Sequence, residues 1–412
     1  MRNTTCIIPL LLLLLLPGIN RAQEIVVSAE GTVTTLSEAI SRADSGDTIT
    51  LTPGIYRERN VVIDKPLTLR GESNAIIDAE GKGYVLIVRA DNVTIRDLQV
   101  QNAGKSFIED YAGILVEKSR NCLIENVKLV ENFFGIYLAE TTESTIRNNS
   151  VTSSAERESS SGNGIHLWYS TQITVEGNTV AGHRDGIYFE FVENSDIRNN
   201  QSRKNLRYGL HFMFSDSCRY SNNIFENNGA GVAVMFTDRV EMTNNVFRDN
   251  WGSAAYGLLL KEIYDSRIEN NRFENNSVGI YMEACNRQQI TGNEFANNGW
   301  AIKLMANSMD NRFSRNNFMG NTFEVATNSR QNFNTFENNY WSQYEGYDLD
   351  RDGIGDVPHR PVRLFSLMVE KEPQTLVLLH SLLVKILDMA ERLMPSLTPE
   401  TLVDSNPQMQ ML

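Results

Sequence analysis

One phrase of the chain repeats between residues 113 and 321, and this repeat restricts the fold more than any other feature. A glycine or another small residue opens each repeat, and similar apolar-rich phrases follow, as at residues 209–213 and 279–283. The opening residues are Gly113, Gly135, Gly164, Gly186, Gly209, Gly231, Gly257, Gly279 and Ala301, at intervals of 22 to 29 residues. Self-similarity at such a period is typical of stacked supersecondary units. Apolar residues alternate within each unit without a helical period, so we expect short strands.

Counting from the glycine gives the layout of one coil. The first and third residues after it are apolar, as in Ile136 and Leu138, and should face inward, while the second and fourth should face outward. Two asparagine columns follow at the fourteenth and nineteenth positions. The first column holds Asn149, Asn178, Asn200, Asn223, Asn245, Asn271 and Asn293, and the second Asn132, Asn205, Asn228, Asn250, Asn276 and Asn298. Stacked asparagines can hydrogen-bond along the axis and tolerate left-handed corners. The pattern predicts an all-β parallel β-helix with about 22 residues per coil, each rising about 4.8 Å.

The sequence suggests five segments. Residues 1–22 have the composition of a secretory signal peptide, with Arg2, an apolar stretch over 6–16 and Ala22 as the cleavage residue. The apolar stretch is shorter than the roughly 20 residues of a membrane-spanning helix, so cleavage is favoured over an uncleaved anchor. Residues 23–112 should form an N-terminal cap, with a helix near 35–43, and the first irregular coils. The regular β-helix should cover 113–340, an acidic loop 341–364 and a helical tail 365–412.

Charge and cysteine content exclude two alternatives. Loss of Arg2 and Arg21 with the signal peptide takes the formal net charge from −13 to −15, which disfavours nucleic-acid binding. Cys122 and Cys218 share a column but lie four coils apart, or about 19 Å. Because a disulfide needs Cα atoms within about 7 Å, these residues and Cys285 are expected to be free thiols.

The outward stripe at the second and fourth positions carries unusual side chains for a solvated face. His211 and Met213 stand together on one strand, and Met235 takes the fourth position on the next coil. Imidazole and thioether are soft ligands suited to Cu(I), and we nominate these three residues, with His166 and Trp168 nearby, as copper candidates. Coverage of the stripe by a loop or a partner would explain the same residues without a metal.

A column of carboxylates suggests other chemistry. Glu193, Asp216 and Asp238 share one column on successive coils, about 5 Å apart, which matches the carboxyl separation in retaining glycosidases. The same column could hold Ca²⁺, and solvated turn residues are the favoured interpretation.

An acidic loop follows the regular repeat. Asp348, Asp350, Asp352 and Asp356 have the oxygen spacing of a Ca²⁺ loop, although His359 stands where a bidentate glutamate is expected. A metal-free acidic turn is the alternative.

The tail has an apolar helical face. One helix is predicted over 374–393, with Leu379, Leu383, Ile386 and Leu387 on one side. This face either packs on the end of the β-helix or docks on a partner protein.

Taken together, these features resemble the NosD family. The resemblance rests on the signal peptide, the phrases at 164–170 and 208–215, the segment from Tyr340 to Pro361 and the leucine-rich tail. It implies a right-handed β-helix in the periplasm that binds copper without catalysis of its own. It also implies work with an ABC transporter permease and its ATPase, receipt of Cu(I) from a copper chaperone lipoprotein, and delivery for maturation of nitrous-oxide reductase. A β-helix polysaccharide lyase, hydrolase or epimerase acting on an acidic sugar polymer is the alternative function.

Overall fold

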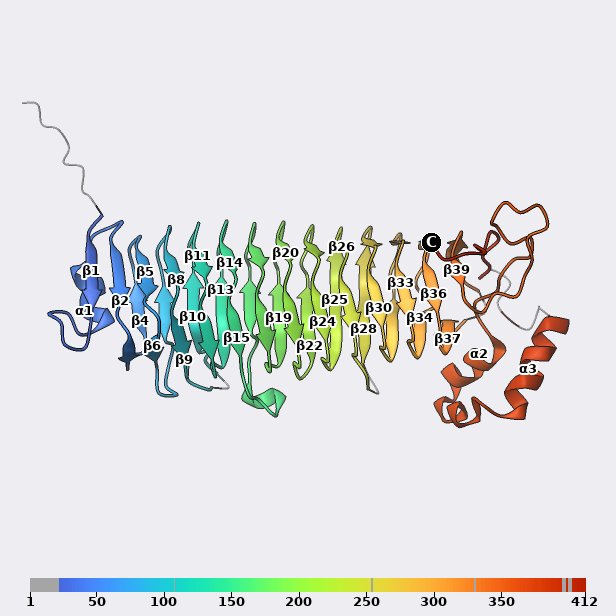
Figure 1. The fold of residues 1–412 in the computed structure, drawn as a ribbon, viewed down its shortest axis with the longest axis horizontal. Coiled ribbons are helices and arrows are strands. Elements are labelled where there is room, and N and C mark those ends of the chain that lie inside the picture. Colours follow the sequence, from blue (N-terminus) through green and yellow to red (C-terminus); the bar gives the residue numbers. More distant parts are fainter. Residues whose placement is uncertain (1–21, 107, 253–254, 330, 395–397, 399–401) are drawn as a thin grey trace, which may run out of the picture.

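The chain is wound into coils that stack along one long axis (Figure 1). The structure is a computed structural model and describes all residues except 1–21, 107, 253–254, 330, 395–397 and 399–401. All of the expected signal peptide except Ala22 therefore lies outside the described residues. Parallel pairing joins every strand to its counterparts in neighbouring coils, giving three long sheets of 14, 13 and 12 strands among the described residues. The predicted parallel β-helix is confirmed.

Each complete coil contributes one strand to each sheet, and we call the sheets A, B and C. Sheet A contains β1 (Glu24–Val27), β2 (Thr48–Leu51), β5 (Thr68–Gly71), β8 (Thr94–Arg96), β11 (Leu123–Glu125), β14 (Thr145–Arg147), β17 (Thr174–Glu176), β20 (Asp196–Arg198), β23 (Arg219–Ser221), β26 (Glu241–Thr243), β29 (Arg267–Glu269), β32 (Gln289–Thr291), β35 (Arg312–Ser314) and β38 (Thr335–Glu337). Sheet B contains β3 (Gly54–Tyr56), β6 (Ala75–Asp78), β9 (Gln99–Gln101), β12 (Lys128–Val130), β15 (Ser150–Thr152), β18 (Thr179–Ala181), β21 (Gln201–Arg203), β24 (Ile224–Glu226), β27 (Val246–Arg248), β30 (Arg272–Glu274), β33 (Glu294–Ala296), β36 (Asn317–Met319) and β39 (Tyr340–Trp341). Sheet C contains β4 (Val61–Ile63), β7 (Leu86–Val88), β10 (Ala112–Glu117), β13 (Phe134–Ala139), β16 (Ile165–Trp168), β19 (Asp185–Glu190), β22 (Tyr208–Met213), β25 (Ala230–Asp238), β28 (Tyr256–Tyr264), β31 (Val278–Glu283), β34 (Trp300–Leu304) and β37 (Phe323–Ala326).

The core is a set of columns of like side chains. Phe247 is fully buried and stacks between Phe225 and Phe273, with ring centroids 5.5 and 4.7 Å away. The inward positions after the glycine, such as Leu210 and Phe212, are also buried. The repeating glycine has a steric cause, because a Cβ on Gly209 would lie 2.7 Å from the carbonyl oxygen of Gly231. The predicted inward positions are therefore confirmed for the regular coils, whereas some of the outward positions, such as His211 and Ala233, are also buried.

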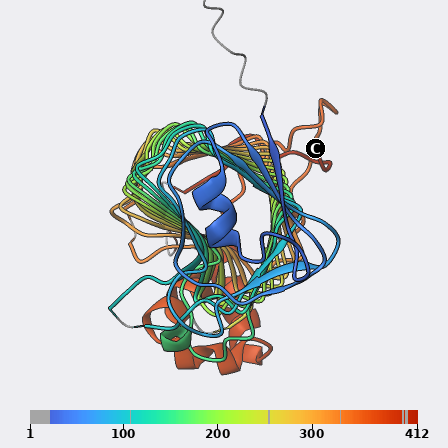
Figure 2. The same ribbon diagram turned by 90° about the vertical axis from the view of Figure 1, so that its left-hand side faces the viewer.

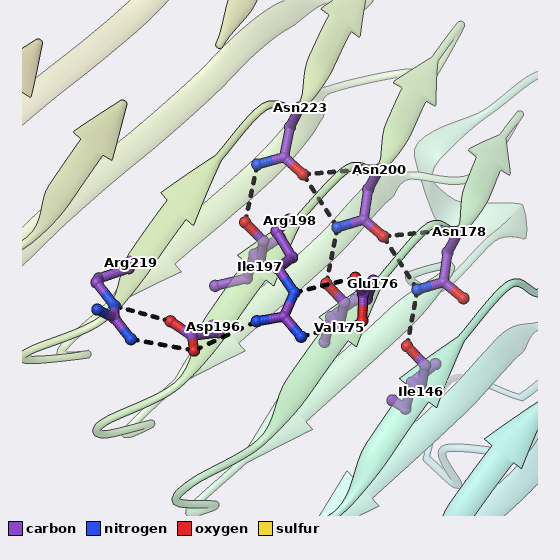
Figure 3. A network of polar contacts seen from close by, with 10 residues as sticks. All are labelled: Ile146, Val175, Glu176, Asn178, Asp196, Ile197, Arg198, Asn200, Arg219 and Asn223. Atoms are coloured by element: carbon purple, nitrogen blue, oxygen red, sulfur yellow. Dashed lines mark hydrogen bonds and ion pairs between the residues drawn. The ribbon is translucent and has the colours of Figure 1, made fainter. Parts of the chain in front are cut away.

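Asparagine ladders hold the corners of the coils, as predicted (Figure 3). Asn178 Nδ2 donates to Asn200 Oδ1 at 3.0 Å and to the Ile146 carbonyl at 2.9 Å, and Asn200 repeats the pattern toward Asn223. Each amide thus satisfies a buried backbone carbonyl and passes a hydrogen bond to the next coil. The second column forms a ladder of the same kind from Asn205 to Asn321.

The N-terminal end is closed by α1 (Leu36–Arg42), which lies across the opening of the coils (Figure 2). Thr35 caps this helix, since its side-chain oxygen accepts from the Glu38 amide at 3.2 Å. Leu36 and Ile40 are buried against the core. The expected helix and its role as a terminal cap are confirmed.

The C-terminal helices differ from the single helix expected over 374–393. They are α2 (Leu364–Lys371), the 3₁₀ helix η2 (Pro373–Leu378) and α3 (Leu382–Leu393). The chain turns between η2 and α3, so that both elements pack against α2, which itself contacts β37. Tertiary packing around Phe365 and Phe323 therefore divides a segment whose apolar pattern is continuous. No helix in the described part of the chain is both long and apolar enough to cross a bilayer.

The last residues return to the β-helix. Asp404 forms β-bridges with Phe336 and His359, and Gln408 with Tyr340 and Ile354. Leu402 is fully buried in the main core. This segment therefore covers the open end of the final coil.

Candidate functional site

The copper candidates lie in two columns on the outer side of sheet C. His166 and His211 belong to the column at the second position after the glycine. Trp168, Met213 and Met235 belong to the column at the fourth position. In the strand register, Met213 lies beside Met235, so these residues and His211 occupy adjacent coils. Tyr188 separates His166 from His211, and Glu190 separates Trp168 from Met213. The structure therefore brings His211, Met213 and Met235 together, whereas His166 and Trp168 lie two coils away from them.

His211 is buried although it stands on the outer side of its strand. Its side chain retains only 5% exposure, and its ring centroid lies 4.7 Å from that of Tyr208 and 5.0 Å from that of Tyr188. Neither ring nitrogen has a hydrogen-bond partner. Buried polar atoms without partners are costly in a folded protein, and imidazole nitrogens of this kind are suited to a metal.

The buried Asp185 forms an ion pair with the half-buried Arg207 beside His211, and the sequence did not predict this pair. Asp185 Oδ1 accepts from Arg207 Nε at 2.8 Å, and Asp185 Oδ2 lies 3.6 Å from His211 Nδ1. Burial raises the pKa of Asp185, but the hydrogen bond from Arg207 and the nearby His211 imidazole outweigh burial and hold this pKa at about 2. Asp185 is the only charged residue that directly precedes an opening glycine of the repeat, which was the available signal.

Met213 and Met235, which we call the sulfur column, are more accessible than His211. Met213, Met235 and Trp168 are half-buried. Tyr188 Oη donates to Met213 Sδ at 3.5 Å. Burial raises the pKa of Tyr188 to about 12, so its hydroxyl keeps its proton at neutral pH. A thioether and an imidazole on one strand, with a second thioether on the next coil, form a donor set that fits Cu(I).

His166 lies in a separate part of the stripe. Its ring lies between those of Tyr137 and Tyr188, tilted against both, with centroids 4.4 and 4.8 Å away. Asn163 Nδ2 donates to its Nδ1 at 3.0 Å. Burial, with the charge of Arg184, lowers the pKa of His166 to about 3, so the imidazole is neutral at physiological pH.

The cysteines are unsuited to copper transfer. Cys122, Cys218 and Cys285 are free, as predicted, and all three are buried. Burial raises the pKa of both Cys218 and Cys285 to about 12, so the thiolate ligand is disfavoured.

In the column of Glu193, Asp216 and Asp238, one carboxylate accepts a hydrogen bond from the backbone of the next coil. Asp216 Oδ1 accepts from the Asp238 amide at 2.8 Å, which is a turn interaction between coils. Burial and the neighbouring Asp216 raise the pKa of Asp238. Glu193 is exposed.

The acidic loop brings three of its four nominated carboxylates together. Ligand atoms of Asp348, Asp350 and Asp352 all lie within 4.8 Å of one another. Asp348 also accepts from the Gly353 amide at 2.9 Å. Asp356 stands outside this group and accepts from the Leu349 amide at 2.7 Å. His359, at the position expected for glutamate, pairs with Glu324 at 2.7 Å.

The nominated tail residues fall into two pairs. Leu379 and Leu387 pack against the cluster of Phe323, Phe365 and Val369 at the end of sheet C. Leu383 and Ile386 are exposed, together with the other large apolar residues Leu382, Met389 and Leu393 of α3.

Comparison with known proteins shows the family of this chain. Residues 37–158 and 150–346 match the model of the family described as "Periplasmic copper-binding protein (NosD)". The chain belongs to the NosD family. It is 32% identical over 419 residues to the "Probable ABC transporter binding protein NosD" of Pseudomonas aeruginosa, covering 90% of each chain. It is 27% identical to the NosD protein of the same description from Stutzerimonas stutzeri, covering 85% of this chain and 84% of that one.

Solved structures outside the NosD family share the fold. A family 28 exopolygalacturonase from Yersinia enterocolitica superposes with a TM-score of 0.61 and 11% identity, covering 78% of each chain. The Dettilon tailspike protein superposes with a TM-score of 0.59 and 14% identity, covering 74% of this chain and 69% of the tailspike. At these identities the likeness shows the β-helix alone and transfers no activity.

Proposed function

We propose that this protein receives Cu(I) in the periplasm and delivers it for maturation of nitrous-oxide reductase, without catalysis of its own. The observation that carries this proposal is the cluster of His211, Met213 and Met235 on adjacent coils, in which neither ring nitrogen of the buried histidine makes a hydrogen bond. Membership of a family described as copper-binding and periplasmic supports the same role.

The geometry suits transfer better than permanent storage. His211 supplies a buried imidazole, and Asp185 lies close enough to Nδ1 to favour a proton there, leaving Nε2 as the donor. Met213 and Met235 supply neutral sulfur ligands at half-buried positions, through which Cu(I) can enter and leave. A thioether carries no proton to lose, so binding of Cu(I) to these two sulfurs releases none.

We further propose that the protein works with an ABC transporter permease and its ATPase, and that a copper chaperone lipoprotein supplies the Cu(I). The relatives are named as ABC transporter binding proteins. The exposed apolar face of α3, which includes Leu383 and Ile386, is a candidate contact for the permease, while Leu379 and Leu387 hold the helical tail on the β-helix.

Cu(I) affinity of the purified mature protein tests the central proposal. Met213→Leu combined with Met235→Leu removes both sulfurs at nearly constant volume, so the fold should be retained. We expect Cu(I) affinity, measured by competition with a chromophoric chelator, to fall at least about tenfold, or about 1.4 kcal/mol. The control is Met282→Leu, a fully buried methionine on the inner face of sheet C. Equal affinities for all three proteins would remove the sulfur column from the site.

A polysaccharide-modifying enzyme is the second candidate. The observation that favours it is the raised pKa of Asp238 beside Asp216, which is the type of perturbation found in acid–base pairs. Chain cleavage or epimerisation of polyuronates by the purified protein, lost in Asp238→Asn, would support this function instead.

A further inference from the structure

Four aromatic side chains form an exposed stack at the turn that follows sheet C. Tyr169, Phe191, Phe214 and Phe236 occupy the same position in successive coils, and we call them the aromatic strip. Their neighbouring ring centroids are 4.5, 5.2 and 5.0 Å apart. Tyr169, Phe191 and Phe214 are 52%, 36% and 41% exposed, and Phe236 is half-buried. A contiguous apolar surface of this kind commonly marks an interaction site.

The backbone of the strip disfavours bulky residues. The four φ angles are 46°, 54°, 49° and 54°, in the left-handed region. This conformation belongs to the turn itself, because Lys118, Glu140, Glu262 and Ala284 adopt it in other coils. Asparagine and glycine accept it most readily, whereas large side chains are strained there. The core does not explain the choice of four aromatic residues, since the strip faces solvent. Strain retained at consecutive exposed positions points to a function.

The strip runs beside the outward column that holds Met213 and Met235. Each aromatic residue directly follows a member of the outward column formed by Trp168, Glu190, Met213 and Met235. A protein seated on the strip would therefore lie beside the two methionine sulfurs.

Carboxylates flank the strip on both sides. Glu190 precedes Phe191, while Glu193, Asp216 and Asp238 lie two residues beyond the aromatic column. Among the residues that the structure describes, Asp238 pairs with Arg239 at 3.7 Å, and no ion pair involves Glu190, Glu193 or Asp216. These acidic groups complement basic residues, which would steer a partner and fix its orientation.

We propose that the aromatic strip is the docking surface of the protein that hands Cu(I) to this chain, and that the contact face of this donor has an apolar centre and a basic rim. The proposal rests on the proposed copper function. A protein fits better than a sugar, because the ring faces are covered by neighbouring rings and mainly edges reach the solvent. An apolar centre with a charged rim is the common arrangement of protein interfaces.

The test uses the mature protein and the purified soluble domain of its copper chaperone lipoprotein, loaded with Cu(I). Phe191→Asn combined with Phe214→Asn removes the rings but installs residues that favour left-handed backbone, so the fold should be preserved. We expect the Kd for the chaperone to rise at least tenfold and the transfer rate to fall. Cu(I) affinity of the free protein should be unchanged. Phe333→Asn, at a residue 63% exposed outside the strip, is the matched control and should bind as the wild type does.

Each remaining outcome decides against docking. Chaperone binding that is equal in the strip variant and the control, or absent in the wild type, overturns the proposal. Concentration-dependent self-association that disappears only in the strip variant, seen by analytical ultracentrifugation, would assign the strip to a second copy instead. Failure of the wild type to bind Cu(I) at all would refute the proposed function, which the chelator titration detects separately. The affinity for the chaperone should also fall as the salt concentration rises, and an affinity independent of salt would contradict the basic rim.

Discussion

Asp404 continues the ladder that Asn339 would otherwise end: its Oδ2 accepts from both the backbone amide and the side-chain amide of Asn339, each at 3.0 Å. Asn339 gives Asn316 the same pair of acceptor contacts one coil earlier. Trp341 Nε1 also donates to Asp404 Oδ2 at 3.0 Å. The carboxylate is fully buried, so a residue from the end of the chain acts as the missing asparagine of the next coil.

Asp404→Ala should therefore loosen the final coils. Buried donors left without an acceptor cost about 1–3 kcal/mol each, and we expect a loss of about 3 kcal/mol in local stability. Hydrogen exchange of the Asn338 and Asn339 amides measures this loss. Asp404→Asn keeps an acceptor oxygen and should lose about 1 kcal/mol or less. Unchanged protection in the alanine variant would contradict the capping role.

The phenylalanine column gives a direct test of the core. Phe247→Ala removes a fully buried ring that stacks on both sides, and should lower the free energy of unfolding by about 3–5 kcal/mol. Chemical denaturation followed by circular dichroism measures the change. The exposed Phe333 is the control, since truncation there should change stability by about 0.5 kcal/mol or less.

His183 should make the protein sensitive to acid. It replaces asparagine in the second ladder column, is fully buried and has no partner for either ring nitrogen. Burial lowers the pKa of His183 to about 4, so the unfolded chain takes up a proton at a higher pH than the folded chain does. The stability that the neutral His183 contributes is therefore full above about pH 6.5, and up to about 3 kcal/mol of it is lost as the pH drops to 4. His183→Asn should reduce this fall by a similar amount, measured as the difference between denaturation at pH 7 and at pH 4.5. Parallel pH profiles for the two proteins would show that His183 does not contribute.

The acidic loop predicts a calcium effect. If Asp348, Asp350 and Asp352 hold Ca²⁺, millimolar Ca²⁺ should raise the melting temperature and a chelator should reverse the rise. Asp350→Asn should abolish this response while leaving Asp348 to accept its loop amides. An identical melting temperature with and without Ca²⁺ in the wild type would leave a metal-free acidic turn.

The proposed contact with the permease can be tested without disturbing the packing of the tail on the β-helix. Deletion of residues 374–412 is unsuitable because it also removes Asp404, so point variants on α3 are required. Leu383→Ser with Ile386→Ser alters two exposed residues and should abolish co-purification with the permease at an unchanged melting temperature. Leu387→Ser is the contrasting variant, because this residue packs on the cluster around Phe365 and its loss should cost about 1–3 kcal/mol. Retained co-purification in the double variant would show that this face has another role.

Local spacing was sufficient for the repetitive part of the molecule. Each coil makes the same contacts with its neighbours, so the position of Phe247 or Asn200 relative to its glycine determines whether it is buried and what it contacts. The same spacing placed Met213 beside Met235. Three free cysteines also followed from counting coils, since separation along the axis is proportional to the number of coils between two residues.

Contacts between non-repeating parts could not be obtained from spacing. The sequence predicted His211 on the outer side of its strand, but the tertiary structure decided that Tyr188, Tyr208 and the Asp185–Arg207 pair surround it. The tail pattern predicted one apolar helix, whereas packing on α2 divided it and left only part of its apolar face exposed. Asp404 reaches Asn339 across 65 residues of chain. A repeat determines its own contacts because the same residues recur at one strand spacing, but a cap or a buried ion pair depends on where a unique segment returns to the surface, and only the folded chain decides that.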